Sequence, residues 1–399
     1  MDSETYEEIS LMELDNIQYY FVMVLAGIPF LISMSNLGSL GSLRGSGDGL
    51  NEAHSSVLVS VLVPARNEED GIIECLQALS EQTHASLEII ILDDRSTDCT
   101  AGIIKSVVDS DPRMRMVRGM ELPSGWHGKH WACEQLAGEA TGEFLLFVDA
   151  DTILSAETVS DALYESKHSN ADLLTVMPRR TANCITERLM FPLMDWLLFC
   201  WMPIRVAHKR RIPNLSSTFG QFMLFKRESY LSIGGHSRIR GNPLDDFNLG
   251  RTIKKIGLKW VLLEGLNCVE VLAYKGNVDA FKGVSRSIFP AINYRVSVFI
   301  LFSIALLGVG LLPLFTLVWT STSASQKDGL MLLSAMSLSM VIISWLIVCL
   351  KFKHSALIIL VYPLSILVIF LAACHSLVTH GFGFTNWKGR RMMGHRIRF

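Results

Sequence analysis

Residues 144–151 read FLLFVDAD, an apolar run typical of a buried strand that ends in Asp149 and Asp151. Residues 87–94 read LEIIILDD and repeat the pattern, with Asp93 and Asp94 at the end of a second apolar run. In an open α/β sheet, ligands bind beyond the carboxyl ends of the strands, so both acidic pairs are expected at the mouth of one site. Gathered carboxylates repel one another unless a cation lies between them. The sequence therefore predicts an α/β sheet with a cation-dependent site at one edge.

The spacing of Asp149 and Asp151 points to a metal ion. In extended backbone, residues two apart point to the same side of the strand. Mg²⁺ and Mn²⁺ prefer carboxylates together with substrate phosphates, so the pair suits a nucleotide diphosphate held through a metal. The competing interpretation is cap chemistry, because Asp before Ser or Thr is a common helix N-cap, and Asp98 and Asp151 both fit it. Two acidic pairs in one βα array favour the metal.

Strand and helix patterns alternate through the middle of the chain. We expect strands at 57–63, 87–92, 114–118 and 143–148, and helices at 69–80, 99–109, 131–140 and 156–168. This alternation predicts a Rossmann-like, mostly parallel sheet, with Pro64 ending the first strand. The absence of a GxGxxG or P-loop sequence disfavours a dinucleotide oxidoreductase or an ATPase.

Apolar segments long enough to cross a bilayer lie near both ends of the 399-residue chain. Residues 18–35 carry no charge, and three further apolar runs occupy 296–319, 329–350 and 355–378. The residues before the first run are acidic, which disfavours a cleaved signal peptide and favours a membrane anchor. Arg44 and the later basic residues favour the cytosol for the middle domain, so we expect a multi-pass membrane protein with a cytosolic catalytic domain.

Three C-terminal crossings would leave the basic tail outside, against the positive-inside tendency. We therefore expect one of the three runs to be re-entrant or interfacial, or the run at 296–319 to form a tight hairpin. The apolar stretch 185–205 is either an interfacial helix or a buried core helix, and 281–294 has amphipathic character. The eight cysteines are scattered without a CxxC, which indicates reduced thiols rather than disulfides or a zinc site.

These patterns divide the chain into seven parts. In order they are an N-terminal tail (1–17), a transmembrane helix (18–35), a linker (36–56), an α/β catalytic domain (57–265), an interfacial amphipathic region (266–295), membrane segments (296–380) and a basic C-terminal tail (381–399).

Four motifs in order along residues 56–265 resemble family 2 glycosyltransferases, enzymes of GT-A fold that use nucleotide-sugar donors. The motifs are PARNE at 64–68, DDRSTD at 93–98, DAD at 149–151 and LDD at 244–246. Three further segments look like the membrane-bound branch with hopanoid-associated, carotenoid-acid and ceramide glycosyltransferases. They are GWHGK at 125–129, the segment from Gly220 to His236, and WKGR at 387–390.

The resemblance implies a role for each motif residue. Asp246 would be the catalytic base with Asp245 beside it, and Asp149 and Asp151 would bind Mg²⁺ or Mn²⁺. The donor would be bound by Asp149 and by Pro64, Arg66, Asn67, Glu68, Asp93, Asp94 and Lys129. Trp126, Gln221 and His236 would contact the acceptor or the sugar. For these three residues, a structural role in a turn or in core packing is an equally good interpretation.

Two of these residues also have a plain structural interpretation that involves no catalytic role. Asp246 begins a predicted helix at 247–256, where an acidic residue is favoured by the helix dipole alone. Lys129 lies in a glycine-flexible turn and could be a solvated loop lysine. Sugar transfer, however, needs a cation at the leaving diphosphate and a base at the acceptor hydroxyl, which these two residues would supply.

The sequence therefore predicts an inverting transfer of one sugar from a nucleotide-diphosphate sugar, UDP-glucose-like, to a membrane lipid. A single addition is favoured because the QxxRW motif of processive synthases is absent at 285–290. The alternatives are a polyprenyl-phosphate glycosyl synthase and a catalytically silent membrane scaffold or lipid-binding protein. Intact carboxylates at every motif argue against the silent protein. No nucleic-acid partner is expected, and the sugar, the lipid and the oligomeric state stay open.

Overall fold

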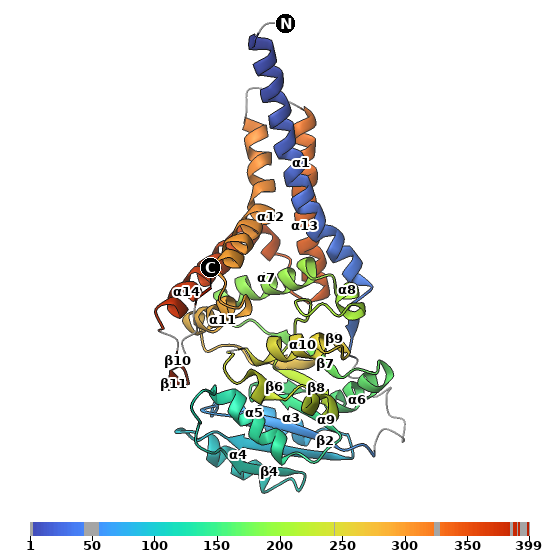
Figure 1. Ribbon diagram of the computed structural model, residues 1–399, viewed down its shortest axis with the longest axis vertical. Helices are drawn as coiled ribbons and strands as arrows, with labels where there is room; N and C mark the ends of the chain where they lie inside the picture. Colours follow the sequence, from blue (N-terminus) through green and yellow to red (C-terminus); the bar gives the residue numbers. More distant parts are fainter. Residues whose placement is uncertain are drawn as a thin grey trace.

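The computed structural model describes residues 3–43, 56–242, 244–322, 328–383, 386–388, 390–391 and 397–398. The molecule is elongated, with an α/β domain at one end and long helices extending away from it at the other (Figure 1). The N-terminus lies at the tip of the long helices, whereas the C-terminal end of the chain returns towards the α/β domain.

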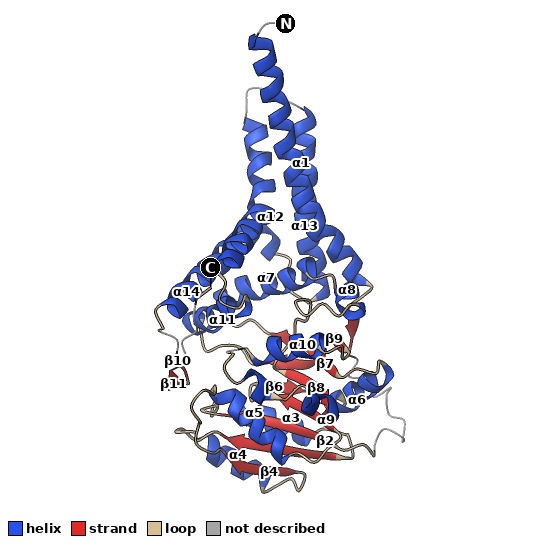
Figure 2. Ribbon diagram, in the orientation of Figure 1, coloured by secondary structure: helices blue, strands red, loops and turns tan. Residues whose placement is uncertain are grey.

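A mixed sheet forms the centre of the α/β domain (Figure 2). Its strand order is β1-β9-β7-β8-β5-β2-β3-β4, and β6 pairs with the end of β9. The pairs β2·β3, β3·β4, β2·β5, β7·β9 and β1·β9 are parallel, while β5·β8, β7·β8 and β6·β9 are antiparallel. The strands are β1 (Gly41–Ser42), β2 (Val59–Ala65), β3 (Leu87–Asp93), β4 (Met114–Arg118), β5 (Phe144–Val148), β6 (Thr152–Leu154), β7 (Leu173–Arg180), β8 (Phe222–Lys226) and β9 (Trp260–Val271). The predicted mostly parallel α/β sheet is confirmed.

Both faces of the sheet are covered, which is why its central strands read as continuous apolar runs. Val61 and Ile91 point into one core, against α3 (Ile72–Ser80), α4 (Thr100–Val108) and α6 (Thr158–His168). Leu62 and Ile90 point into the other core, which includes α5 (Gly128–Glu139) and α10 (Asp245–Lys255). Shorter helices α8 (Ile204–Lys209) and α9 (Arg227–Ser232) and the 3₁₀ turn η1 (His236–Ile239) complete the domain.

The prediction that Pro64 ends the first strand is wrong, because β2 continues to Ala65. On the β3 side the ladder runs on to the pair Ala65↔Asp93. On the β5 side it stops at Leu62↔Phe147. Since Val59 and Ala65 bond towards β3, the nitrogen of Pro64 faces the β5 side, where pairing has already ended, and its missing N–H breaks no bond.

Four helices have the length and apolar composition to cross a membrane, among the described residues. They are α1 (Ser3–Leu37, apolar from Ile17), α12 (Val296–Thr322), α13 (Asp328–Lys351) and α14 (Ile358–Gly381). α12 is one continuous helix through Pro313, so the hairpin considered for 296–319 is not formed. The linker expected at 36–56 contributes β1, which pairs with β9, and residues 44–55 lie outside the described residues.

Both ends of α14 lie on the side of the α/β domain. Before it, Lys351 pairs with Glu264 of β9 at 3.4 Å. At its end, the ring of His380 bonds the backbone oxygen of Arg286 at 3.0 Å, in α11 (Asn277–Ala291). Further on, Lys388 forms an ion pair with Glu68 in the loop after β2. The chain before α14, the end of α14 and Lys388 therefore all contact the α/β domain or α11 beside it.

The apolar stretch near 185–205 forms α7 (Ile185–Trp201), which lies between the long helices and the sheet (Figure 1). Trp196 is fully buried, and its indole N–H donates to the Ser344 hydroxyl of α13 at 2.8 Å. α7 also packs against α1, α11 and α14. The buried-helix interpretation is the one that the structure supports.

Candidate active site

Strand register sets the position of the site. β3, β2 and β5 are parallel neighbours, so the segments after them meet at one edge of the sheet. The chain adds β3 on one side of β2 and β5 on the other, which makes this edge a topological switch point. The predicted motifs 64–68, 93–98 and 149–151 all lie there.

The first two motifs hold each other in place. The backbone N–H of Asn67 donates to Ser96 Oγ at 3.0 Å, and the Asn67 side-chain oxygen accepts from the backbone of Thr97 at 2.9 Å. Asp93 is buried and accepts from the backbone N–H of Ser96 at 3.1 Å. Arg66 donates to the backbone oxygen of Asp94 at 2.5 Å. The two loops form one preorganised wall, and Pro64 lies at its base within β2.

Asp149 and Asp151 follow β5 and lie in a desolvated environment that contains other charged groups. Burial raises the pKa of Asp149 to about 6, with Asp151 and Asp245 adding to the rise against Lys129. Burial and the nearby Glu68 also raise the pKa of Asp151. Both carboxyls therefore gain from an additional cation, which a divalent ion would provide.

Lys129 lies in the first turn of α5 and links the acidic groups. Its Nζ is 2.7 Å from Asp149 Oδ1 and 3.3 Å from Asp245 Oδ2. Burial alone would lower its pKa, but Asp149 and Asp245 hold the pKa well above its ordinary value. Lys129 is thus a permanent cation between strand β5 and helix α10, and the solvated-loop interpretation does not apply.

Asp245 and Asp246 begin α10 and have opposite electrostatic environments. Burial would raise the pKa of Asp245, but Lys129 and His236 hold it well below its ordinary value. Burial and the charge of Asp245 raise the pKa of Asp246 from 3.8 to about 7. Asp246 accepts from the backbone N–H groups of Phe247 at 2.7 Å and Gly220 at 3.3 Å. Two adjacent carboxyls, one always ionised and one titrating near neutrality, give the proton affinities that a base and its partner require.

Gly220 allows the loop before β8 to approach this cluster. A Cβ atom at this position would lie 3.2 Å from Lys129 Nζ and 3.5 Å from Asp246 Oδ2. A side chain would therefore crowd the lysine ammonium and fill the space beside the carboxylate. Gln221 follows directly and is partly exposed at the rim of the cluster.

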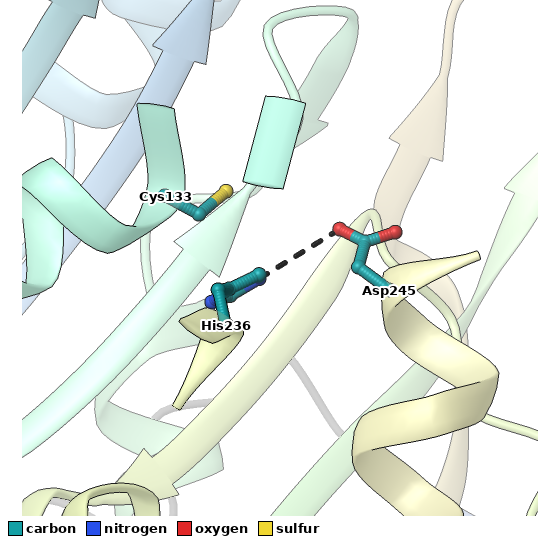
Figure 3. A group of neighbouring side chains, drawn as sticks. All are labelled: Cys133, His236 and Asp245. Atoms are coloured by element: carbon teal, nitrogen blue, oxygen red, sulfur yellow. Dashed lines mark ion pairs between the residues drawn. The ribbon is translucent and has the colours of Figure 1, made fainter. Parts of the chain in front are cut away.

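Cys133, His236 and Asp245 form a buried group behind Asp245 (Figure 3). Their ligand atoms lie within 4.8 Å of one another, the one such group of three among the described residues. Burial raises the pKa of Cys133, which keeps it a thiol, and Lys129 already neutralises Asp245. His236 is fully buried, and its Nδ1 pairs with the hydroxyl of Tyr230 at 2.8 Å. This group positions Asp245; His236 has no surface for an acceptor.

His130 was not identified from the sequence as a neighbour of Asp245. His130 packs beside His236, with ring centroids 6.1 Å apart, and burial lowers its pKa to about 3, so it is a neutral neighbour of Asp245. The signal for it was present in the GWHGKH stretch, where His127 and His130 are one helical turn apart. Trp126 packs on Trp131 with ring centroids 5.1 Å apart and remains partly exposed.

Lys388 brings the C-terminal tail to the donor wall. It pairs with Glu68, donates to the backbone oxygen of Asn67 at 3.0 Å, and its own backbone oxygen accepts from Arg66 at 3.3 Å. Lys388 of the WKGR motif, over 300 residues from PARNE in sequence, therefore lies at the same wall. No local pattern could have revealed this contact.

The chain fits a divalent ion at Asp149 and Asp151. Mg²⁺ is usually bound by one or two carboxylates, with substrate phosphates and water completing its octahedron. Burial raises the pKa of both carboxyls, and neighbouring acidic groups add to the rise, so an additional cation beside them would stabilise their ionised forms. The predicted metal ligands thus have suitable chemistry, whereas the Cys133 group does not.

A sheet of this topology with an acidic edge defines a GT-A type nucleotide-sugar fold. Residues 60–234 match the family model described as glycosyl transferase family 2. A 4,4'-diaponeurosporenoate glycosyltransferase of Staphylococcus haemolyticus is 26% identical over 238 residues, which is 57% of this chain and 60% of that protein. The Staphylococcus aureus protein of the same name is 27% identical over 232 residues, 57% of this chain and 58% of that protein.

A solved structure shares the fold. The mannosyltransferase of Pyrobaculum calidifontis, determined with GDP-mannose and Mn²⁺, aligns with a TM-score of 0.51 and 19% identity. The alignment covers 83% of this chain and 99% of that protein. Residues 60–234 are thus similar to glycosyltransferase family 2, and the matched part of the chain spans about 60% of the length of its curated relatives.

Proposed function

We propose that this protein is an inverting glycosyltransferase that moves one sugar from a nucleotide-diphosphate sugar to a membrane lipid at the cytosolic face. The observation that carries the proposal is the cluster Asp149, Lys129, Asp245 and Asp246 at the switch-point edge of the sheet. This edge is the part of the domain that faces α7, α11 and the long helices (Figure 1).

The donor would occupy the wall formed by the loops after β2 and β3. Asp93 and Asp94, both buried at this wall, would bind the nucleoside, and Pro64, Arg66, Asn67 and Glu68 would shape its floor. A divalent ion at Asp149 and Asp151, Mg²⁺ or Mn²⁺, would neutralise the charge that grows on the leaving diphosphate. Lys129 holds Asp149 in position for that task and adds a fixed positive charge to the same edge.

The reaction needs one base. As the acceptor oxygen forms its bond to the anomeric carbon, the bond to the diphosphate breaks, and the hydroxyl proton passes to Asp246. The pKa of Asp246, raised by burial to about 7, gives a carboxylate basic enough to accept that proton and still ionised in cytosol. A direct displacement of this kind inverts the anomeric configuration.

The lipid side of the proposal is supported by α14. Polar contacts join the chain on both sides of this 24-residue helix to the α/β domain, so α14 would lie at the surface of the bilayer next to the domain. Leu357, Leu360, Leu371 and Phe382 along it are mostly exposed, which a lipid environment would cover. The curated relatives are named for diaponeurosporenoate, a carotenoid acid, which favours an isoprenoid or similarly long acceptor.

The test uses membranes containing the full chain, incubated with a panel of labelled nucleotide sugars, of which UDP-glucose is the first candidate. We expect label in the organic extract as a single-sugar lipid, dependent on Mg²⁺ or Mn²⁺ and lost with Asp246→Asn. Label in a polymer would contradict single addition. A lipid-phosphate product that persists in the Asp246→Asn variant would favour the polyprenyl-phosphate synthase, because a phosphate acceptor needs no base.

A further inference from the structure

A second concave surface lies away from the active site, beside α8. The cavity has a volume of about 250 Å³ and is lined by residues 207–211 and by Lys254, Gly257, Leu258, Lys259 and Trp260. Five of these ten lining residues are Lys or Arg, and none is acidic. We call it the α8 pocket. Its lining predicts an anionic ligand.

The cations of the α8 pocket have no acidic partners among the residues that the structure describes. Lys209, Arg210 and Arg211 are exposed, and the ion pairs found in the described part of the chain include none of them. The adjacent Asp172 carboxylate is occupied by the backbone N–H of Lys259 at 2.7 Å and by Ser229. Like charges held together without counter-ions destabilise a fold, so packing does not account for this cluster.

The floor of the α8 pocket is rigid. Lys254 is buried, and its Nζ donates to the backbone oxygens of Ala207 and Leu215, both at 2.6 Å. The same ammonium lies 4.9 Å from the ring centre of Trp260. Arg211 lies against Gly257, where an added Cβ would be 2.9 Å from the guanidinium. The pocket is therefore formed before any ligand arrives.

The α8 pocket begins where the N-terminal long helix ends. Asn36 in the last turn of α1 donates to the backbone oxygen of Met202 at 2.8 Å and accepts from the N–H of Ile204 at 2.9 Å. α1 is long and apolar enough to cross a membrane up to Leu37, and in that arrangement this junction would place α8 at the bilayer surface. Val206 and Ile212, at 41% and 43% exposure, flank the basic residues. Cations interleaved with exposed apolar side chains are typical of a surface that touches anionic lipid.

We propose that the α8 pocket binds the phosphate headgroup of an anionic phospholipid in the leaflet that faces the α/β domain. Arg210 and Arg211 supply planar guanidinium groups that suit phosphate oxygens, while Lys209 adds a mobile cation. Val206 and Ile212 contact the acyl region. This site is separate from the acidic edge that carries the proposed sugar transfer, and it does not depend on that function.

The test titrates the detergent-purified full chain with phosphatidylglycerol or phosphatidylcholine and follows bound lipid by native mass spectrometry. The test variant is Lys209→Gln with Arg211→Gln; the matched control is Lys105→Gln with Lys167→Gln, which removes the same charge from α4 and α6. Each surface cation contributes about 5-fold in affinity, so we expect the test variant to bind phosphatidylglycerol about 25-fold more weakly. The control and phosphatidylcholine binding should not change.

Two further measurements separate lipid binding from binding of soluble phosphate and from a folding defect of the variant. Inorganic phosphate is added as a competitor, and displacement of phosphatidylglycerol at equal affinity would overturn the lipid assignment in favour of a soluble phosphate. Thermal unfolding without lipid checks that the double variant folds; if it does not, the exposed Arg210→Gln alone should give about a 5-fold loss. Retention of phosphatidylglycerol affinity within about 2-fold in the folded variants would overturn the proposal.

Discussion

Replacing Asp246 by Asn removes the proposed base while keeping the size of the side chain. A positioned base contributes about 10² to 10⁴-fold in rate, so we expect a loss of transfer within that range. Donor affinity should stay nearly intact, because the donor wall lies on β2, β3 and β5. Turnover is measured with the lipid-product assay, and donor affinity by calorimetry with uridine diphosphate.

The dependence of kcat/KM on pH gives a second, independent test of Asp246 as the base. The active form of Asp246 is the carboxylate, and its pKa is raised to about 7. The kcat/KM of the wild type should therefore rise with pH, by about tenfold per unit well below the pKa, and level off above it. The residual activity of Asp246→Asn should lack this dependence. Asp245 does not produce such a profile, because Lys129 and His236 keep it ionised throughout.

Stability should change in the opposite direction from activity. A carboxyl whose pKa is higher in the folded than in the unfolded protein destabilises the fold once pH exceeds the unfolded value, 3.8. Asp246→Asn should thus stabilise the protein at pH 7 and make no difference below about pH 4. The shift corresponds to at most about 4 kcal/mol, and partial exposure reduces the expected gain to about 1–2 kcal/mol. Thermal unfolding at both pH values measures it.

The Asp109→Asn variant changes an exposed residue and is the control for effects of mutagenesis and purification. It should match the wild type in every assay. Three results would refute the reasoning: turnover above about a tenth of wild type, an unchanged pH profile in Asp246→Asn, or a loss of stability at pH 7. The first would transfer the role of base to Asp245 or favour a phosphate acceptor. The last would show that Asp246 is a structural helix-start residue.

Three other predictions test the remaining parts of the site. Asp151→Ala should weaken metal-dependent binding of uridine diphosphate by about 10 to 100-fold in calorimetry, and metal-independent binding of undiminished strength would contradict the metal assignment. Lys129→Met leaves Asp149 and Asp245 without their shared cation, so we expect a loss of about 3–5 kcal/mol in chemical unfolding, partly restored by Mg²⁺; unchanged stability would exclude a buried ion pair. The exposed thiol of Cys99 should react with an impermeant maleimide only after cells are opened, with Cys99→Ala as control, and labelling in intact cells would place the domain outside.

The sequence was informative wherever local spacing governs structure. The runs 87–92 and 114–118 became β3 and β4 within one residue. β3 is a buried strand with a nearly continuous apolar sequence, whereas β4 is an edge strand that is mostly half-buried and contains two arginines. The same logic located Asp149 and Asp246 at strand and helix ends. It could not show that Lys129 joins them, since that contact depends on how α5 packs over the sheet.

The sequence also could not predict the arrangement of the long C-terminal helices. Length and hydropathy are the same for α12, α13 and α14, and they contain no information on which helix returns to the domain. The distinction comes from single polar contacts at helix ends, including that of His380 with the backbone of Arg286. Within the tail, Lys388 lies against the donor wall and therefore on the same side as the α/β domain.

The two halves of the sheet have different contacts, and this division is consistent with the proposed transfer to a lipid. β2, β3 and β5 carry the donor wall and the acidic edge. β7 and β9 are tied to the long helices: Asp195 of α7 pairs with Arg180 at the end of β7 and lies 2.7 Å from His354, which follows α13.

β9 is also connected to the long helices, because Lys353, which follows α13, donates to Asn267 of β9 at 2.5 Å. Because β8 hydrogen-bonds to both β5 and β7, these ties fix the acidic edge at a constant height relative to the long helices. In the proposed reaction, an acceptor held in the bilayer would have to extend its polar end past α7 and α11 to reach Asp246. A long lipid with a terminal hydroxyl or carboxyl meets that requirement, whereas a freely diffusing sugar would have no need of it.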